Sequence, residues 1–157
     1  MNYKKTLESK TKIRFQDCDP FNHLNNSKYL DYFVNHREDE VVNAYNIDMH
    51  KMAKETGKSW VTGSNQIVYI KPAFVMETVL IESQLIHTTN SELHVEMRMY
   101  DENKTHLKSL MWSKFVHFNL LKLKRENHTK EMLLLFESIK EPLKETSFEE
   151  RLENIKS

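Results

Sequence analysis

Apolar and polar residues along the chain follow two periods, one typical of helices and one typical of strands. After a cap at Asn25, Asn26 or Ser27, apolar side chains recur every three to four residues, which predicts one long helix ending before Gly57. We interpret the charged stretch at residues 36–40 as part of its solvated face. The apolar positions of this helix are Tyr29, Leu30, Phe33, Val34, Val41, Val42 and Tyr45.

The period falls to two on either side of this helix. Residues 92–99 alternate strictly, so Leu93, Val95, Met97 and Met99 are expected on the buried face of a strand. Turn-forming residues bound the other predicted strands, which cover residues 8–17, 60–71, 78–88 and 105–120. The last of these is much longer than the usual five or six residues. We therefore expect a curved or bulged sheet, and wrapping around the helix satisfies that geometry.

The tail returns to helical spacing, in two pieces separated by Pro142. A capping box at residues 147–150 begins the second piece. One helix followed by consecutive strands predicts an α+β fold. With 157 residues, we expect a single domain over 1–157, with a core of about 8–120 and a helical C-terminal extension at 129–157.

Composition excludes several classes of function. The 23 basic and 23 acidic residues cancel, so we expect neither nucleic acid nor a membrane as partner. Gly57 and Gly63 are the only glycines, which removes glycine-rich phosphate loops. A single cysteine, Cys18, excludes disulfide frameworks and thiolate-rich zinc sites. The polar N-terminus and the absence of a long apolar run lead us to expect a cytoplasmic protein.

Candidate chemistry is densest between Asp17 and Tyr29, in the connection from the first strand to the helix. Backbone N–H groups in the first turn of a helix have no internal partner and carry the positive end of the helix dipole. They can therefore stabilise an oxyanion that develops on a docked carbonyl. A carboxylate just upstream can attack that carbonyl or activate a water molecule that does.

The segment 14–32 resembles the opening of the hotdog-fold acyl-CoA thioesterases of the 4-hydroxybenzoyl-CoA type. That pattern has an Asp-x-Asp pair, then His-x-Asn-Asn, then a tyrosine three residues later. The matching residues here are Asp17, Asp19, His23, Asn25, Asn26 and Tyr29. The similarity extends through the turn at residues 70–73 and covers about residues 10–120, leaving the C-terminal extension outside it.

The resemblance implies a hotdog fold, with a curved antiparallel sheet wrapped around a long central helix, and hydrolysis of an acyl-CoA. It implies Asp19 as the catalytic carboxylate and a homodimer or homotetramer that holds the acyl chain between subunits. Coenzyme A enters as part of the substrate, and no cofactor or metal is expected. Two residues depart from the pattern, Asn22 where the family often has glycine and Phe21 where acyl-carrier-protein thioesterases usually have asparagine.

Each candidate residue also has a structural interpretation. Asp19 can serve as nucleophile or as general base, and an aspartate before Pro20 can also simply form an Asx-turn. Asp17 is more often structural in such a pair. His23 can orient Asp19, contact the substrate or pack in the turn. We interpret Asn25 and Asn26 as caps and loop clamps that position the site, and Tyr29 as core or acyl-tunnel lining.

Two alternative mechanisms at this loop are disfavoured. Flanking carboxylates raise the pKa of a thiol, which argues against Cys18 as nucleophile. A hydrolytic metal site built from Asp17, Asp19 and His23 would usually need better spaced ligands, and the other histidines show no ligand spacing.

The sequence leaves the substrate carrier open. Lys71 and Lys114 are our candidates for contacts to coenzyme A, ahead of Lys122, Lys124 and Arg125. An acyl-carrier-protein thioesterase is one alternative, and a hotdog protein that binds acyl groups without hydrolysing them is another. Asp19 distinguishes the last case, because a binding protein has no reason to keep a carboxylate at the reacting carbonyl.

Overall fold

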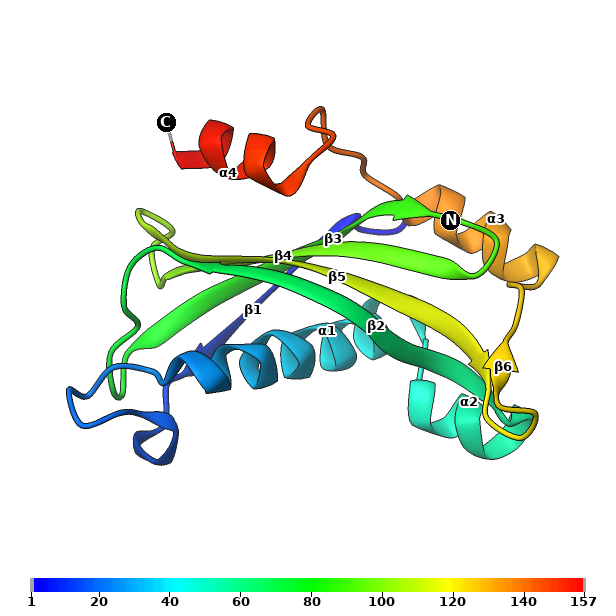
Figure 1. Cartoon of the computed structure of the whole chain (residues 1–157), viewed down its shortest axis with the longest axis horizontal. Helices are drawn as coiled ribbons and strands as arrows, with labels where there is room; N and C mark the ends of the chain where they lie inside the picture. Colours follow the sequence, from blue (N-terminus) through cyan, green and yellow to red (C-terminus); the bar gives the residue numbers. More distant parts are fainter. Residues whose placement is uncertain (1, 157) are drawn as a thin grey trace.

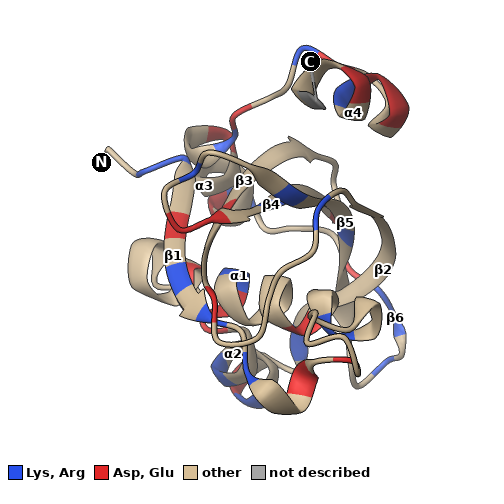
Figure 2. Cartoon of the chain, turned by 90° about the vertical axis from the view of Figure 1, so that its left-hand side faces the viewer, with Lys and Arg blue, Asp and Glu red and all other residues tan. Residues whose placement is uncertain are grey.

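A curved antiparallel sheet wraps around one long helix (Figure 1). The computed structural model describes residues 2–156. The strands lie in the order β1-β3-β4-β5-β2, with the short β6 paired to β5. They are β1 (Thr6–Lys12), β2 (Lys58–Tyr69), β3 (Thr78–Thr88), β4 (Glu92–Asp101), β5 (Leu107–Asn119) and β6 (Lys124–Arg125). The helices are α1 (Tyr29–Tyr45), α2 (Met49–Thr56), α3 (Lys130–Ile139) and α4 (Phe148–Lys156). Viewed end-on, the strands form an arch over α1 (Figure 2).

The predicted single helix is wrong, because the chain forms two. Helix α1 ends at Asn46, whose φ of 58° is left-handed and whose N–H bonds back to the carbonyl of Val42 at 3.0 Å. Asparagine tolerates this conformation better than most residues, so it can end a helix as glycine does. Asp48 then caps α2, and Gly57 ends it with φ 72°. In the sequence, Asn46 also fits the polar face of a continuous helix, so the hydrophobic pattern does not indicate that the helix ends there.

Curvature of the sheet is confirmed, and three register shifts accompany it. They fall at Gly63 in β2, between Leu85 and His87 in β3, and at Lys108 in β5, opposite Met99 and Tyr100 of β4. A β-bulge of this kind bends its strand and increases the local twist. At Gly63 a side chain would meet Val116 Cγ2 at 3.0 Å, so glycine permits the close approach of β2 and β5.

The first strand is shorter than predicted. Strand β1 stops at Lys12, and residues 15–17 form a single 3₁₀ turn. Ile13 is fully buried while Phe15 is 72% exposed, so the apparent alternation of these two residues does not mark one face of a strand. The chain therefore leaves the sheet early and gives a longer connection to α1.

The concave face of the sheet and helix α1 form the core. The apolar side chains of β4 predicted to be buried do face α1, with Val95, Met97 and Met99 at 2% exposure or less and Leu93 half-buried. The prediction fails at His36 and Arg37, which lie on the buried stripe of α1 and not on a solvated face. They follow Phe33 by three and four residues, the spacing that keeps side chains on one face of a helix.

The C-terminal extension runs along the sheet, and its last helix covers the convex face (Figure 1). The capping box is half formed, because the Glu150 N–H donates to Ser147 Oγ at 3.1 Å but the Glu150 carboxylate accepts from Thr146. Arg151 of α4 donates two hydrogen bonds, at 2.9 and 2.8 Å, to Glu96, a fully buried carboxylate of β4. These bonds therefore fix α4 on part of the convex face of the sheet.

Candidate active site

Asp19 opens a tight turn between β1 and α1. Its carbonyl accepts from the Asn22 N–H at 3.0 Å, and its own N–H donates to the His23 carbonyl at 2.8 Å. Pro20 favours the second position of such a turn. Asn22 has a φ of 63°, so the left-handed backbone for which the family often uses glycine forms here with asparagine. A backbone bridge between Cys18 and Leu24 closes the base of the turn.

Backbone hydrogen bonds hold this turn against the loop between β2 and β3. The Leu24 N–H donates to the Ala73 carbonyl and the Val75 N–H to the Asn22 carbonyl, both at 2.8 Å. His23 packs edge-on against Phe74, with ring centroids 5.2 Å apart. Two loops far apart in the sequence therefore form one wall of the site.

These loops and the start of α1 enclose a cleft of about 230 Å³. Of the residues that the sequence nominated, five line it, namely Asp19, His23, Asn26, Tyr29 and Lys71. The other lining residues are Leu24, Tyr69, Ile70 and Pro72. A carboxylate, a histidine, an ammonium group and the beginning of a helix thus face one small space.

The Asp19 carboxylate is fixed through one of its oxygens. Oδ1 accepts from the N–H groups of Phe21 and His23, at 2.9 and 3.1 Å. Oδ2 makes no hydrogen bond to a described residue. The Asx-turn and a chemical role are therefore compatible, because the first uses Oδ1 and leaves Oδ2 for a ligand. His23 does not orient Asp19 through its ring, since its bond to Oδ1 comes from the backbone.

Asn25 and Asn26 hold the start of the helix. Asn25 Oδ1 accepts from the N–H of Ser27 at 3.0 Å and so caps the 3₁₀ turn that leads into α1. The backbone N–H of Asn26, at the edge of the cleft, donates to no described residue. This amide at the start of the helix is therefore free to donate a hydrogen bond to a ligand.

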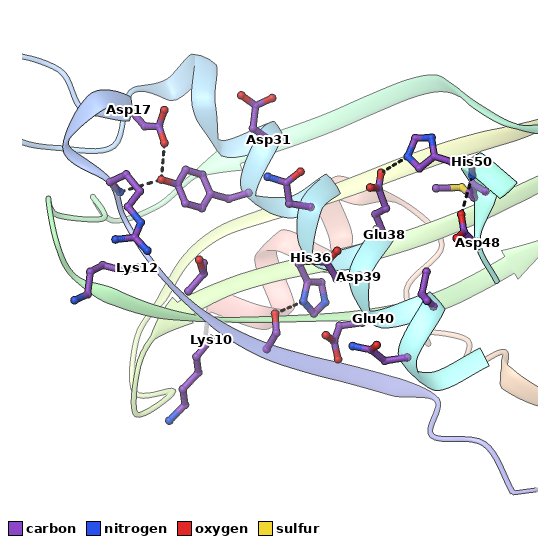
Figure 3. Close-up of a pocket in the computed structure, with 18 of the residues that line it drawn as sticks. Lys10, Lys12, Asp17, Asp31, His36, Glu38, Asp39, Glu40, Asp48 and His50 are labelled. Carbon is purple, nitrogen blue, oxygen red and sulfur yellow. Dashed lines mark hydrogen bonds and ion pairs between the residues drawn. The ribbon is translucent and has the colours of Figure 1, made fainter. Parts of the chain in front are cut away.

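Asp17 faces away from this cleft. It lines a separate groove along α1, where the Tyr32 hydroxyl donates to its Oδ2 at 2.6 Å (Figure 3). The same hydroxyl accepts from the Arg14 N–H at 3.0 Å, and burial followed by the bond to Asp17 raises the pKa of Tyr32 to about 12. Asp17 therefore ties the loop to α1, through a helix side chain and not through the loop amides.

Cys18 lies between the two carboxylates in an environment that disfavours its thiolate. Burial raises the pKa of the thiol, and the charges of Asp19 and Asp17 raise it further. The thiol donates to the Arg14 carbonyl at 3.4 Å. A nucleophilic thiolate would need the opposite electrostatics.

Sequence reasoning missed two residues that shape the cleft. Tyr69, at the end of β2, lines it, packs edge-on against Tyr29 and donates its hydroxyl to the Asn26 carbonyl at 3.0 Å. Lys108 is 5% exposed and donates to the Pro72 carbonyl at 2.8 Å and to the Glu77 carboxylate at 3.1 Å. The position of Tyr69 just before the 70–73 turn was a usable signal, whereas nothing local marks Lys108.

The two lysines nominated for coenzyme A lie at different places. Lys71 is at the cleft, where its ammonium group donates to His106 Nδ1 at 3.2 Å. Lys114 lies on β5 beside Phe115, which packs into the core, so alternation turns Lys114 to the opposite, convex face. It lines a groove next to α4 and does not reach the cleft of its own chain.

Neither a metal cluster nor a membrane helix is found in the part of the chain that is described. Within residues 2–156, no three His, Cys, Asp or Glu side chains gather closely enough to hold a metal ion. No helix in the same range is long and apolar enough to cross a membrane.

Residues 13–143 match the thioesterase-like superfamily, and the chain belongs to this family of hotdog thioesterases. The match begins just after β1 and covers strands β2 to β6, the Asp19 loop, helices α1 and α2, and helix α3 of the C-terminal extension. A comparison with curated protein sequences finds no significant match.

Solved structures with the same fold include several thioesterases. The probable thioesterase YbaW from Escherichia coli is 21% identical with a TM-score of 0.72, and the alignment covers 86% of this chain and 99% of that one. The 1,4-dihydroxy-2-naphthoyl-CoA thioesterase Slr0204 from Synechocystis is 10% identical with a TM-score of 0.77, over 87% and 99%. The DHNA-CoA thioesterase from Staphylococcus aureus is 14% identical with a TM-score of 0.76, over 97% and 95%.

Proposed function

We propose that this protein hydrolyses the thioester bond of an acyl-CoA, with Asp19 as the reacting carboxylate. The observation that carries the proposal is a cleft lined by both Asp19, whose Oδ2 has no hydrogen-bond partner among the described residues, and Asn26, whose N–H has none either, inside a thioesterase-like fold. A carboxylate oxygen and a backbone amide that both lack protein partners, in residues lining one cleft, suit addition to a carbonyl and stabilisation of the resulting oxyanion.

The chemistry needs only groups present at the cleft. Acting as general base, Asp19 Oδ2 takes a proton from water, and the oxygen of that water adds to the thioester carbon while the Asn26 N–H binds the oxyanion. The C–S bond then breaks, and the proton held by Asp19 passes to the leaving sulfur. The bonds of Oδ1 to Phe21 and His23 fix the direction of the carboxylate during these steps. We favour this route over direct attack by Asp19, which would form an acyl anhydride.

Lys71 supports coenzyme A as the carrier. Lys71 lines the cleft, and an ammonium group there suits a phosphate of coenzyme A. Phe21 stands where acyl-carrier-protein thioesterases usually have asparagine, and 79% of its surface is exposed. A protein that binds acyl groups without turnover remains a second candidate, but it would not require a carboxylate oxygen held open at the reacting carbonyl.

We also propose that the protein works as a homo-oligomer. Strand β2 has twelve residues and pairs only with β5, so its outer edge has no partner among the described residues. An open edge of this length favours pairing with another strand. Phe21 and Phe74, exposed by 79% and 48%, add apolar surface beside the cleft that a second copy would cover.

A substrate panel tests the proposed activity. Acyl-CoA thioesters from short to long, aliphatic and aromatic, are assayed by release of free thiol, in parallel with the same acyl groups on acyl-carrier protein. We expect turnover of at least one acyl-CoA and weaker turnover of the carrier-protein thioesters. Saturable binding with no thiol release from any substrate would instead identify an acyl-binding protein.

A further inference from the structure

The turn between β5 and β6 exposes apolar side chains to solvent. Leu121 and Leu123 are 83% and 76% exposed, more than any other leucine in residues 2–156, and Leu120 is 38% exposed. A single exposed leucine is ordinary in a folded protein, but three within four residues form a patch. The turn lies at the end of the sheet opposite the Asp19 loop (Figure 1).

Backbone hydrogen bonds hold this turn in one shape. Asn119 Oδ1 accepts from the N–H groups of Leu121 and Lys122, at 3.1 and 2.9 Å. The Leu120 N–H donates to the Gly57 carbonyl, just after α2, at 2.7 Å. The position of the turn therefore does not depend on burial of its leucines.

Leu123 has a left-handed backbone, with a φ of 54°. Glycine and asparagine adopt this conformation readily, whereas for leucine it costs free energy. Backbone strain of this kind is found mainly where the residue has a function. The exposed side chain of Leu123, and not its backbone, is what this position offers to a ligand.

Lysines without ion-pair partners surround the leucines. Lys122 and Lys124 flank Leu123, and both are exposed and form no ion pair with a described residue. Lys54, in the last turn of α2, is exposed and unpaired as well. The end of α2 touches the turn, because a Cβ on Gly57 would meet Leu121 Cδ1 at 2.8 Å.

The acidic side chains beside the turn are mostly paired. Glu126 forms an ion pair with Lys58 at 3.3 Å, and Glu92 forms one with Arg125 at 2.9 Å. In residues 49–58 and 119–126, Glu55 is the only carboxylate without an ion pair. The unpaired charge at this end is therefore mainly positive, an excess that the balanced charge of the whole chain hides.

We propose that the β5–β6 turn docks the protein on the surface of an anionic lipid membrane. Leu121 and Leu123 enter the boundary between headgroups and acyl chains, as the apolar face of an interfacial anchor does. The lysines keep their ammonium groups at the lipid phosphates, with their aliphatic stems along the apolar surface. A few leucines alone bind weakly, and the lysines supply the second contribution that such anchors need.

A small projecting turn suits a lipid surface better than a protein or a nucleic acid. A specific protein interface takes about 800 Å² from each partner, more than one turn supplies. Single-stranded nucleic acid is bound by stacking on aromatic side chains, and residues 119–125 contain none. A membrane requires neither a complementary pocket nor a large contact area.

Vesicle sedimentation tests the proposal without any substrate. The protein is mixed with vesicles of phosphatidylcholine alone, or of phosphatidylcholine and phosphatidylglycerol in equal parts, at low and at high sodium chloride. We expect binding to the anionic vesicles only, and loss of most of it at high salt, because salt screens exposed charges. No binding to either vesicle, or equal binding to both, would overturn the proposal.

Leu123→Asn removes one apolar side chain and should not weaken the fold, because asparagine tolerates the left-handed backbone. Its binding to the anionic vesicles should fall by about tenfold or more, the effect of losing the burial of one leucine. Met76→Asn is the matched control. Met76 is 54% exposed with a φ of 65°, in the loop between β2 and β3 at the other end of the sheet, and its replacement should leave binding unchanged. Equal binding by the two variants would refute docking through the turn.

The charges are tested separately. Lys122→Gln with Lys124→Gln should weaken binding at low salt by roughly thirtyfold, or about fivefold for each lysine near an anionic surface. Asp19→Asn should bind as the unmodified protein does, because docking does not depend on the proposed hydrolysis. A second copy of the chain is the competing occupant of the turn. Dissociation of an oligomer by Leu123→Asn in sedimentation velocity, with no vesicle binding by the unmodified protein, would assign the turn to that interface and overturn membrane docking.

Discussion

Removing Arg151 should detach the C-terminal helix from the sheet. Glu96 is fully buried and accepts from Arg151 at 2.9 and 2.8 Å, and also from Arg98 and from Trp112 Nε1, the latter at 2.7 Å. Breaking a buried ion pair from one side costs about 3–5 kcal/mol. Because Arg98 and Trp112 remain, we expect Arg151→Met to cost about 3 kcal/mol, the lower end of that range. The loss of folding free energy cannot grow much beyond this value, because α4 then detaches and water reaches the Glu96 carboxylate.

Urea unfolding followed by circular dichroism measures this effect. With an m-value of about 2 kcal/mol/M, a loss of about 3 kcal/mol moves the midpoint down by about 1.5 M. The control is Lys10→Met, which breaks a half-exposed ion pair of 3.7 Å with Glu102 and should change the midpoint little. The double variant Glu96→Gln and Arg151→Met should recover part of the loss, because Glu96 then carries no charge, whereas the buried Glu145, which pairs with Arg151 at 3.3 Å, still loses its partner. Equal midpoints for Arg151→Met and Lys10→Met would refute this account of the extension.

Three further predictions concern the core and the Asp19 loop. Burial, followed by the charge of Arg37, lowers the pKa of His36 to about 4 in the folded protein, against 6.5 for the free side chain. Between these values the unfolded chain binds a proton that the folded protein does not bind, so a lower pH favours unfolding. The contribution of His36 to the free energy of unfolding is therefore complete above pH 6.5 and falls by up to about 3 kcal/mol as the pH drops to 4. A His36→Asn variant should show a flatter pH dependence of its urea midpoint in that interval, and an unchanged slope would contradict the assignment. Cys18→Ser should keep activity within about twofold in the thiol-release assay, since a protonated thiol does no chemistry, and strong inactivation would revive the thiol mechanism. Single-turnover hydrolysis in oxygen-18 water should label only the product acid, and peptide mass analysis that finds label in Asp19 would show direct attack.

Strand periodicity predicted the sheet well because each strand buries one face. The bounds predicted for β3, residues 78–88, are those observed. Hydrophobic periodicity fails where the same residue type is compatible with two different local structures. Asn46 fits both a helix surface and a left-handed helix end, and His36 and Arg37 look solvent-facing although the helix buries them. Their burial depends on Ser83, a residue 46 positions from Arg37 that no local pattern connects to it.

The sequence predicted only those residues of the site that lie close together along the chain. The order of residues between Asp17 and Tyr29 placed Asp19, His23, Asn26 and Tyr29 at one cleft because they lie on one continuous segment that leads into α1. Tyr69 reaches the same cleft through a loop contact that depends on the whole sheet. Lys114 shows the opposite error, since its nomination ignored the face on which an alternating strand places it.

The most direct test of the central claim compares Asp19→Asn with Asp17→Asn, two carboxylates two residues apart that face different spaces. On the best substrate of the acyl-CoA panel, Asp19→Asn should lower kcat by roughly a hundredfold or more, as expected for loss of a general base or nucleophile. Its urea midpoint should stay close to that of the unmodified protein. Asp17→Asn should keep most of its kcat and lose stability, because its bond to Tyr32 weakens. Full activity in Asp19→Asn with loss of activity in Asp17→Asn would contradict the assignment of Asp19.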